Sequence, residues 1–495
     1  MSDLQPFGLL VLGMAAVALL AVLSSRLSER THVPAPAMFF AAAAVAGHLA
    51  PVLHALPLHT VDRIVTIALV VILFDGGLHI GWPKFRAAAG PIALVGIAGT
   101  FLTAGATAVV AHALLGVNWW LALLVGTAVA PTDPAVVFSV LGKREMAGGS
   151  ATVLEGESGA NDPVGIALMA SLIAAGGVGT AAWGHVTADF LLQMLLGAAV
   201  GLVGGRLLLL FMQRVPLPSE GLYPLRALAG ALVIFGVASV GRGSGFLAVF
   251  VAGVVLGEAK APYKREIERF HSALASLAEI VAFVVLGLSV DLRQLARADV
   301  WQPALLIAVA LAFAIRPLVV GVLLSRTDLR RSERAFVLWA GLKGAVPLLL
   351  GALLLEANVP QAARLYAVIV VIVAFSVLVQ GSTLPIAAGW LHVPMRTVEP
   401  EPWSLGVRLR EEPEGVHRMT IAAGSPADGS TIEQFIDSND NVWVSLVLRD
   451  GLLVPVQRNT RLQAGDDLLI LGASSVRADL DAAFRRRMPH SDGPG

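Results

Sequence analysis

Long apolar runs recur along the first 390 residues of this chain, and they constrain its fold more than any other feature. A helix that crosses the roughly 30 Å hydrocarbon core of a bilayer needs about 20 predominantly apolar residues. Thirteen runs approach that length, at residues 6–24, 35–53, 62–81, 91–115, 118–141, 158–177, 187–212, 223–240, 244–258, 274–291, 300–324, 335–356 and 362–389. Since 56% of the 495 residues are hydrophobic and only 14% are charged, residues 1–390 are predicted to form an all-α polytopic membrane domain.

The orientation of this domain follows from the basic residues near its loops. Fifteen Lys and Arg residues lie after odd-numbered runs, against five near the loops after even-numbered runs. Loops on the cytoplasmic side of a membrane carry the excess of Lys and Arg. The sequence therefore predicts an external N-terminus and a cytoplasmic C-terminus.

The composition also excludes several classes of function. The chain has no cysteine, so it has neither disulfides nor thiolate metal sites. Its 35 basic and 35 acidic residues cancel, and charge gives no reason to expect nucleic acid as a partner. No GxGxxG motif follows a strand in the C-terminal part, and we expect no cofactor.

Beyond the last apolar run the composition changes. A Pro-rich, charged linker is predicted at 391–402, a small α+β cytoplasmic domain at 403–485 and a disordered tail at 486–495. Within this domain, VWVSLVLRDGLLVPV contains two β-branched runs joined by a turn, which predicts a hairpin. DDLLILG predicts a third strand and VRADLDAAFRRR a closing amphipathic helix.

The apolar run 118–141 is interrupted by the sequence APTDPAVV. Pro131 and Pro134 remove two amide donors and should break the helix. The freed carbonyls and Thr132 must then line a cavity, because broken backbone is not tolerated in contact with lipid. Asp133 is either a purely structural partner of a helix dipole or part of an ion site.

The next run begins with the sequence ESGANDP. By helical spacing Glu157 and Asn161 share one face, while Ser158 and Asp162 share the neighbouring face. We expect Asp162 about one turn inside the helix, among small residues that leave room for an ion. An ionised group at the bilayer centre costs roughly 2.5–3.5 kcal/mol on insertion scales. Such groups therefore persist when they form an ion pair, are hydrated or have a function. Asp162 is therefore the candidate proton and cation carboxylate, with a structural ion pair as the alternative.

Two later runs carry a basic residue each. Arg316 lies deep in the run 300–324 and is predicted to form a buried ion pair with Glu157. The sequence GLKGAVP contains Lys343 between two glycines and a proline, which predicts a second broken helix. Lys343 is expected at the negative ends of half-helices.

The two predicted breaks occupy corresponding positions. If the second to sixth and the ninth to thirteenth runs form two five-helix units, each break falls in the fourth member, and seven helices separate them. A repeat after an odd offset inserts with inverted topology, and paired interrupted helices indicate the binding site of an alternating-access transporter.

One further acidic residue, Asp75, lies in the sequence FDGGLHI near the cytoplasmic end of the third run. Helix packing and a role in an ion entry path are both open for it. The GxSG sequence at residues 156–159 matches the nucleophile motif of intramembrane serine proteases. We do not expect this activity, because no later histidine lies at membrane depth to act as the general base.

These motifs resemble the cation:proton antiporter-1 family of sodium (potassium)/proton exchangers across about residues 6–390. The resemblance rests on FDGGL (74–78), TDP (132–134), ESGAND (157–162), Arg316 and GLKG (341–344). It implies a homodimer with a dimerisation unit and a six-helix core that carries crossed, broken helices and moves vertically. Thr132, Ser158 and Asp162 would hold the ion. The Asn161–Asp162 pair is similar to that of electroneutral exchangers, whereas Lys343 stands where many relatives have arginine.

Residues 403–485 resemble the C-terminal regulator-of-potassium-conductance (TrkA-C-like) domain, on GSPADGSTIEQF and VLRDGLLVPVQRNTRLQAGDDLLILG. The combination is similar to bacterial potassium/proton antiporters, which implies the bacterial inner membrane and a small regulatory ligand such as a nucleotide. The sequence thus predicts a transporter that exchanges K⁺ or Na⁺ for H⁺ by competition at Asp162. A cation channel gated by the C-terminal domain is the alternative.

Overall fold

The computed structural model contains two compact units, residues 1–400 and 401–495. It describes residues 34–49, 57–141, 144–146, 149–257, 261–325, 329–393, 395–397, 415–437, 442–449 and 452–472, together with a few isolated positions. The first predicted run, 6–24, lies outside these residues, as do the predicted tail and most of the predicted closing helix.

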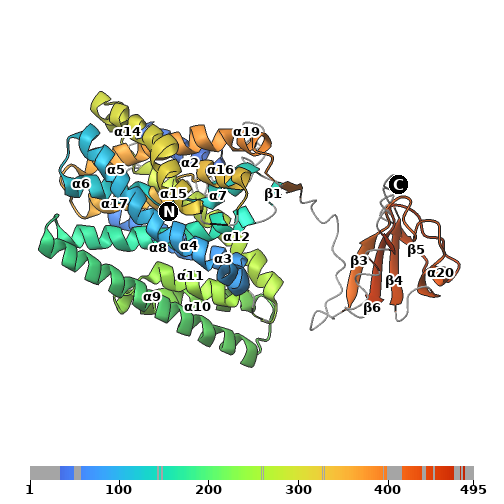
Figure 1. The fold of residues 1–495 in the computed structure, drawn as a ribbon. Coiled ribbons are helices and arrows are strands. Elements are labelled where there is room, and N and C mark those ends of the chain that lie inside the picture. Colours follow the sequence, from blue (N-terminus) through green and yellow to red (C-terminus); the bar gives the residue numbers. More distant parts are fainter. Residues whose placement is uncertain are drawn as a thin grey trace, which may run out of the picture. The chain divides into compact units, whose positions relative to one another are not determined.

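The first unit is almost entirely helical (Figure 1). Its helices are α2 (Ala35–Leu49), α3 (Leu58–Ala87), α4 (Ala89–Ile92), η2 (Ala93–Ala98), α5 (Gly99–Leu115), α6 (Trp119–Val129), α7 (Pro134–Leu141), α8 (Gly149–Ala175), α9 (Thr180–Arg214), α10 (Leu222–Val240), α11 (Gly245–Leu256), α12 (Lys264–Leu288), α13 (Leu292–Leu295), α14 (Ala298–Ala310), η3 (Leu311–Ile315), α15 (Arg316–Leu324), α16 (Arg331–Trp339), α17 (Ala345–Glu356), α18 (Ala362–Phe375), η4 (Ser376–Gly381) and α19 (Ser382–Trp390). Seven helical stretches of the described chain are long and apolar enough to cross a membrane, and four apolar helices are shorter.

The twelve predicted runs that fall on described residues each correspond to helix, and both predicted breaks are present. One run divides into α6 and α7 around residues 130–133, and another into α16 and α17 around residues 340–344. The start of α8 differs from the prediction, because this helix begins at Gly149 and not near residue 158. The polar residues 157–162 therefore lie at least two turns inside α8, and a hydropathy window mistakes such an interior polar stretch for a helix end.

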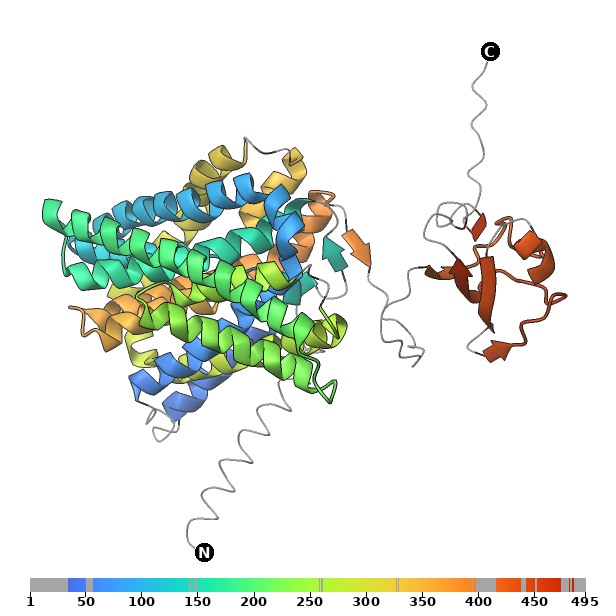
Figure 2. The ribbon, with the colours of Figure 1, turned by 90° about the horizontal axis from the view of Figure 1, so that it is seen from below.

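The helices of the first unit pack in two groups (Figures 1 and 2). One group consists of α2, α3 and α9 to α12, and in both views the green helices α9 and α10 lie together along one side of the bundle. The other group contains α4 to α8 and α14 to α19, including both breaks. Helices α3, α8, α9, α11, α12 and α17 provide the principal contacts between the groups.

Glycines bring α3 and α11 into backbone contact within the first group. A Cβ atom on Gly77 would overlap the carbonyl of Phe250, and one on Gly253 would overlap the carbonyl of Phe74. Small residues allow this close approach between helices that lie in lipid. The second glycine of the FDGGL sequence, Gly77, therefore serves helix packing, whereas a Cβ atom on Gly76 would meet open space.

The described part of the second unit contains a four-stranded antiparallel sheet in the order β3-β6-β4-β5 and helix α20. Its elements are β3 (Val416–Thr420), α20 (Ile432–Asp437), β4 (Val442–Arg449), β5 (Leu452–Val454) and β6 (Asp467–Gly472). The predicted hairpin is confirmed as β4 and β5, and the predicted third strand as β6. The sequence analysis missed β3 and α20.

Part of the predicted linker is ordered. Residues Met395–Thr397 form strand β2, which pairs antiparallel with β1 (Arg144–Met146). The segment that follows the last membrane helix is thereby attached to the loop between α7 and α8.

Candidate cation site

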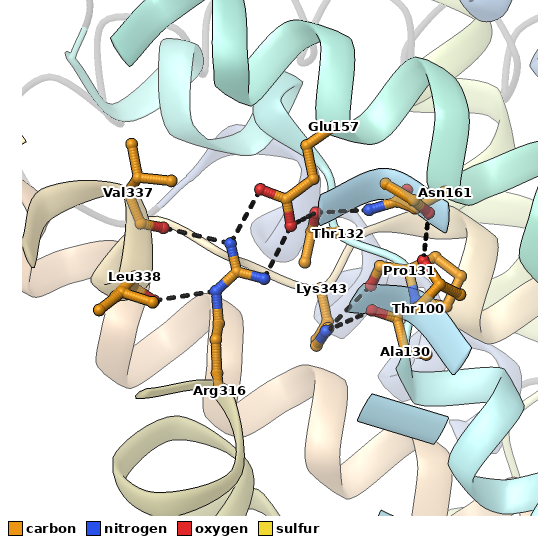
Figure 3. A network of polar contacts seen from close by, with 11 residues as sticks. Thr100, Ala130, Pro131, Thr132, Glu157, Asn161, Arg316, Val337, Leu338 and Lys343 are labelled. Atoms are coloured by element: carbon orange, nitrogen blue, oxygen red, sulfur yellow. Dashed lines mark hydrogen bonds and ion pairs between the residues drawn. The ribbon is translucent and has the colours of Figure 1, made fainter. Parts of the chain in front are cut away.

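A polar cluster lies where the two helix breaks meet helix α8 (Figure 3). Its members share burial in an otherwise apolar bundle. The buried polar and charged side chains are Thr132, Glu157, Ser158, Asn161, Asp162, Arg316 and Lys343. The sequence placed these residues on four separate segments, and the fold brings them together.

The two breaks contact each other through their backbones. The amide of Asp133, in the first break, donates to the carbonyl of Leu342, in the second, at 2.8 Å. The carboxylate of Asp133 lies against Gly344, the residue that precedes α17, so that a Cβ atom there would overlap it. A negative charge at this position is favourable, because the N-terminus of a helix carries partial positive charge.

Lys343 makes the complementary contact in the opposite direction. Its ammonium donates to the carbonyls of Ala130 and Pro131, each at 3.0 Å, where α6 has just ended (Figure 3). These carbonyls have lost their helical donors, and a cation there both bonds them and offsets the negative helix end. Each break therefore places a charged side chain at a helix end made by the other.

Glu157 and Arg316 form the predicted ion pair with a bidentate geometry. Arg316 Nη1 lies 2.8 Å from Glu157 Oε1, and Arg316 Nη2 lies 3.1 Å from Glu157 Oε2. The guanidinium also donates to the carbonyls of Leu338 at 3.0 Å and Val337 at 3.1 Å, which end α16 (Figure 3). Both charges are thus compensated and hydrogen-bonded, as a buried pair requires.

Thr132 connects this ion pair to the rest of the cluster. Its hydroxyl donates to Glu157 Oε1 at 3.2 Å and accepts from Asn161 Nδ2 at 2.8 Å. The amide group of Asn161 is fixed by this bond, and its carbonyl oxygen Oδ1 is buried without a hydrogen-bond partner among the described residues.

Asp162 differs from every other charged member of the cluster. Only 7% of the residue is exposed, and its Oδ2 accepts a long hydrogen bond of 3.3 Å from Ser158. Its Oδ1 is buried, and no described residue bonds it. Unpaired buried carboxylate oxygens are rare, because each costs the desolvation of a charged group. The oxygens of Asp162 and Asn161 are therefore available to a ligand.

Three π-helical segments border the cluster, and the sequence analysis foresaw none of them. Segment η3 ends directly before Arg316, while η2 lets Gly96 approach Ala160 of α8 closely. Segment η4 contributes Ser376, which accepts from the amide of Lys343 at 3.1 Å and donates to Gln380 at 2.8 Å. Such π segments occur frequently at functional sites. The i, i+4 spacing of Ser376 and Gln380 in an apolar run marks these two polar residues in the sequence but does not indicate a π-helix.

The predicted entry-path residue Asp75 does not belong to this cluster. It lies on α3 at the contact with α12, accepts a hydrogen bond of 3.2 Å from Ser272 and lies 3.5 Å from His79 Nδ1. Another acidic residue, Glu279 of α12, escaped the sequence analysis, although it is near enough to Asp133 to interact electrostatically.

Asp162 forms no ion pair with any described residue, whereas the neighbouring charges are paired or lie at helix ends. Glu157 pairs with Arg316, Lys343 bonds the carbonyls of Ala130 and Pro131, and the carboxylate of Asp133 lies against the start of α17. The available carboxylate oxygen belongs to Asp162. A single proton or a single monovalent cation would neutralise this carboxylate, and oxygen ligands suit hard cations.

Comparison with known proteins gives the family. Residues 15–390 match the family model described as "Sodium/hydrogen exchanger, transmembrane", and residues 416–485 match the TrkA-C domain. The chain is 34% identical over 436 residues to the "K(+)/H(+) antiporter NhaP" of Alkalimonas amylolytica, which covers 86% of this chain and 75% of that protein. It is 31% identical over 481 residues to the "K(+)/H(+) antiporter NhaP2" of Shewanella sp. (strain MR-4), covering 95% and 82%.

The solved structure of the sodium proton antiporter MjNhaP1 from Methanocaldococcus jannaschii at pH 8 supports the fold. It superposes with a TM-score of 0.63 at 22% sequence identity and covers 75% of this chain and 99% of that one. The predicted fold class, a multi-pass helical membrane domain followed by a small α+β domain, is confirmed. The chain belongs to the sodium/hydrogen exchanger family of membrane proteins and carries a C-terminal TrkA-C domain.

Proposed function

We propose that this protein exchanges one monovalent cation for one proton across the membrane, with the two ions competing for Asp162. The buried oxygen of Asp162, which no described residue bonds, carries this proposal. Because either ion neutralises the same carboxylate, only one of them binds at a time. Exchange is then one for one and electroneutral.

The same charge argument explains the coupling. A bare carboxylate pays a large desolvation penalty in a medium of low dielectric constant, whereas a neutralised one does not. The site therefore changes its exposure from one side of the membrane to the other only when Asp162 holds a proton or a cation. The crossed breaks at 130–133 and 340–344 keep broken backbone and ion ligands inside the protein and away from lipid.

The cation is held by oxygen atoms around Asp162. Ser158, Asn161 and Thr132 supply neutral oxygens, and Asp133 adds its field from the N-terminal end of α17. We favour K⁺ as the transported ion, with Na⁺ possible, because the relatives that cover most of this chain are named K(+)/H(+) antiporters.

Purified protein in liposomes tests the function directly. Adding K⁺ or Na⁺ outside proteoliposomes that contain a pH-sensitive dye should move protons outward in wild-type vesicles and not in Asp162→Asn vesicles. The alternative, a gated cation channel, predicts a cation current that persists without any proton movement. Absence of cation-driven proton flux in wild-type vesicles would end the antiporter proposal.

The remaining features of the proposal concern assembly and control. We propose a homodimer in the bacterial inner membrane, with the N-terminus periplasmic and the TrkA-C domain cytoplasmic, as the loop charges favour. The domain regulates exchange by binding a small ligand, for which a nucleotide is the candidate. Mass measurement in detergent and binding of labelled nucleotides to the whole protein test these points.

A further inference from the structure

A fourth carboxylate, Glu279, lies beside the cluster on helix α12, outside the helix group that carries the two breaks. Its Oε1 atom is buried and has no hydrogen-bond partner within the described part of the chain. Buried polar atoms without protein partners are rare, and a ligand or a water molecule commonly completes them. Helix α12 packs against α17, which begins at the second break.

Asp133 links Glu279 to the cluster. It interacts electrostatically with Glu279 and also with Asp162. These three carboxylates, on α12, in the first break and on α8, together attract cations.

Glu279 also belongs to a polar stripe on α12. Glu268, Ser272 and Ser276 precede Glu279 at helical spacing and share one face of the helix. Buried residues of α12, such as Ile267 and Ala278, lie on a different face of the helix.

No residue of the stripe is fully buried. Ser276 is exposed, Ser272 and Glu279 are partly buried, and the side chain of Glu268, 35% exposed, lies 3.6 Å from Lys264. Asp75 and His79 of α3 meet the stripe at Ser272. A series of polar groups thus runs along α12 from Glu268 near its N-terminal end to Glu279.

We infer that Glu279 is the staging carboxylate of the transport pathway, which receives a monovalent cation from the α12 stripe and delivers it to Asp162. The inference rests on the proposed exchange function and adds a second, transient cation position to it. Glu279 then contributes to the capture of the cation, whereas Asp162 contributes to its exchange. By the loop charges this stripe opens on the cytoplasmic side.

Glu279→Gln separates these roles, because it removes the charge and retains the size of the side chain. In proteoliposomes, with K⁺ or Na⁺ as the probe, the half-saturating cation concentration should rise by about tenfold. The maximal rate should stay within about twofold of wild type, since the chemistry at Asp162 is untouched. Glu266→Gln, an exposed residue in the first turn of the same helix, is the matched control and should leave both parameters unchanged.

Two results overturn the inference. One is an unchanged half-saturating concentration in Glu279→Gln, and the other is loss of the maximal rate at every cation concentration in protein that elutes and melts like wild type. If Glu279→Gln does not fold, Glu279→Asp tests the same point, since the shortened reach should raise the half-saturating concentration by about threefold. An unchanged value in that variant also overturns it. Failure of the proposed function is distinguishable, because wild-type protein would then show no exchange.

Discussion

The polar stretch on α8 has a buried carboxylate at each end, and the two differ in their hydrogen bonds. We call Glu157, whose oxygens are both bonded, the closed end, and Asp162, which keeps one oxygen that no described residue bonds, the open end. Both oxygens of Glu157 are bonded, by the guanidinium of Arg316 and by the hydroxyl of Thr132. Asp162, five residues later, has one long bond from Ser158 and one oxygen without a partner among the described residues. Burial and charge alone do not distinguish a structural carboxylate from a functional one, whereas the partners of its oxygens do.

The most severe test of this comparison is the isosteric change Asp162→Asn at the open end. It removes the charge that a proton or cation must neutralise, so we expect complete loss of cation-driven proton flux in proteoliposomes. Stability should be equal to or above that of wild type, because a neutral amide requires no ion. Thermal unfolding of the detergent-purified protein, measured beside transport, checks both statements.

The same chemical change in α9, Asp189→Asn, serves as the control and should preserve transport. Residual exchange in Asp162→Asn above that of empty liposomes would show that the open carboxylate is not the shared site. A strong fall in its melting temperature would contradict the distinction between the two ends of the stretch.

At the closed end the expected effect is on stability. Glu157→Gln leaves the guanidinium of Arg316 buried without its counter-charge, which should lower the free energy of unfolding by about 3–5 kcal/mol. Replacing both partners together, as Glu157→Leu with Arg316→Met, should recover much of this loss, because no uncompensated charge remains. Thermal unfolding of the single and double variants measures the difference, and equal melting temperatures for the two would refute the structural role.

The sequence alone predicted the segments of this site well, because charged residues are costly in a membrane-spanning run and persist there when they are paired or bind an ion. Both breaks, the pair of Glu157 with Arg316 and the position of Lys343 at a negative helix end agree with the structure. These predictions follow from local rules, since proline removes donors and buried charges require partners.

Other features of the site depend on tertiary packing that no local pattern expresses. The start of α8 was placed nine residues too late, since its interior polar residues hid the helix from a hydropathy reading. Glu279 lies on a helix that is not adjacent in sequence to either break, and its proximity to Asp133 arises only when α12 packs on α17. The π segments likewise carry no periodic signal that differs from an ordinary helix.

Gly344 tests the contact between the breaks, on which both ends depend. A Cβ atom there would overlap the carboxylate of Asp133, so Gly344→Ala must displace a charged group or the start of α17. We expect about 1–3 kcal/mol of destabilisation and slower exchange. Gly236→Ala in α10, where a Cβ atom meets open space, is the control. Equal stability and transport in the two variants would show that the crossing tolerates rearrangement.

Ser158→Ala has the smallest expected effect and examines the open end alone. The hydroxyl of Ser158 lies 3.3 Å from Asp162 Oδ2, so its loss removes one neutral ligand and leaves the carboxylate in place. A hydrogen bond of this kind contributes about 0.5–1.5 kcal/mol, which should raise the half-saturating cation concentration by roughly two- to tenfold. Ser150→Ala is a matched control on the same helix, because Ser150 is buried and its hydroxyl has no partner among the described residues. A larger loss of stability than of cation affinity in Ser158→Ala would assign that hydroxyl to helix packing, and Asp162 would then bind its cation with the oxygens of Asn161 and Thr132 alone.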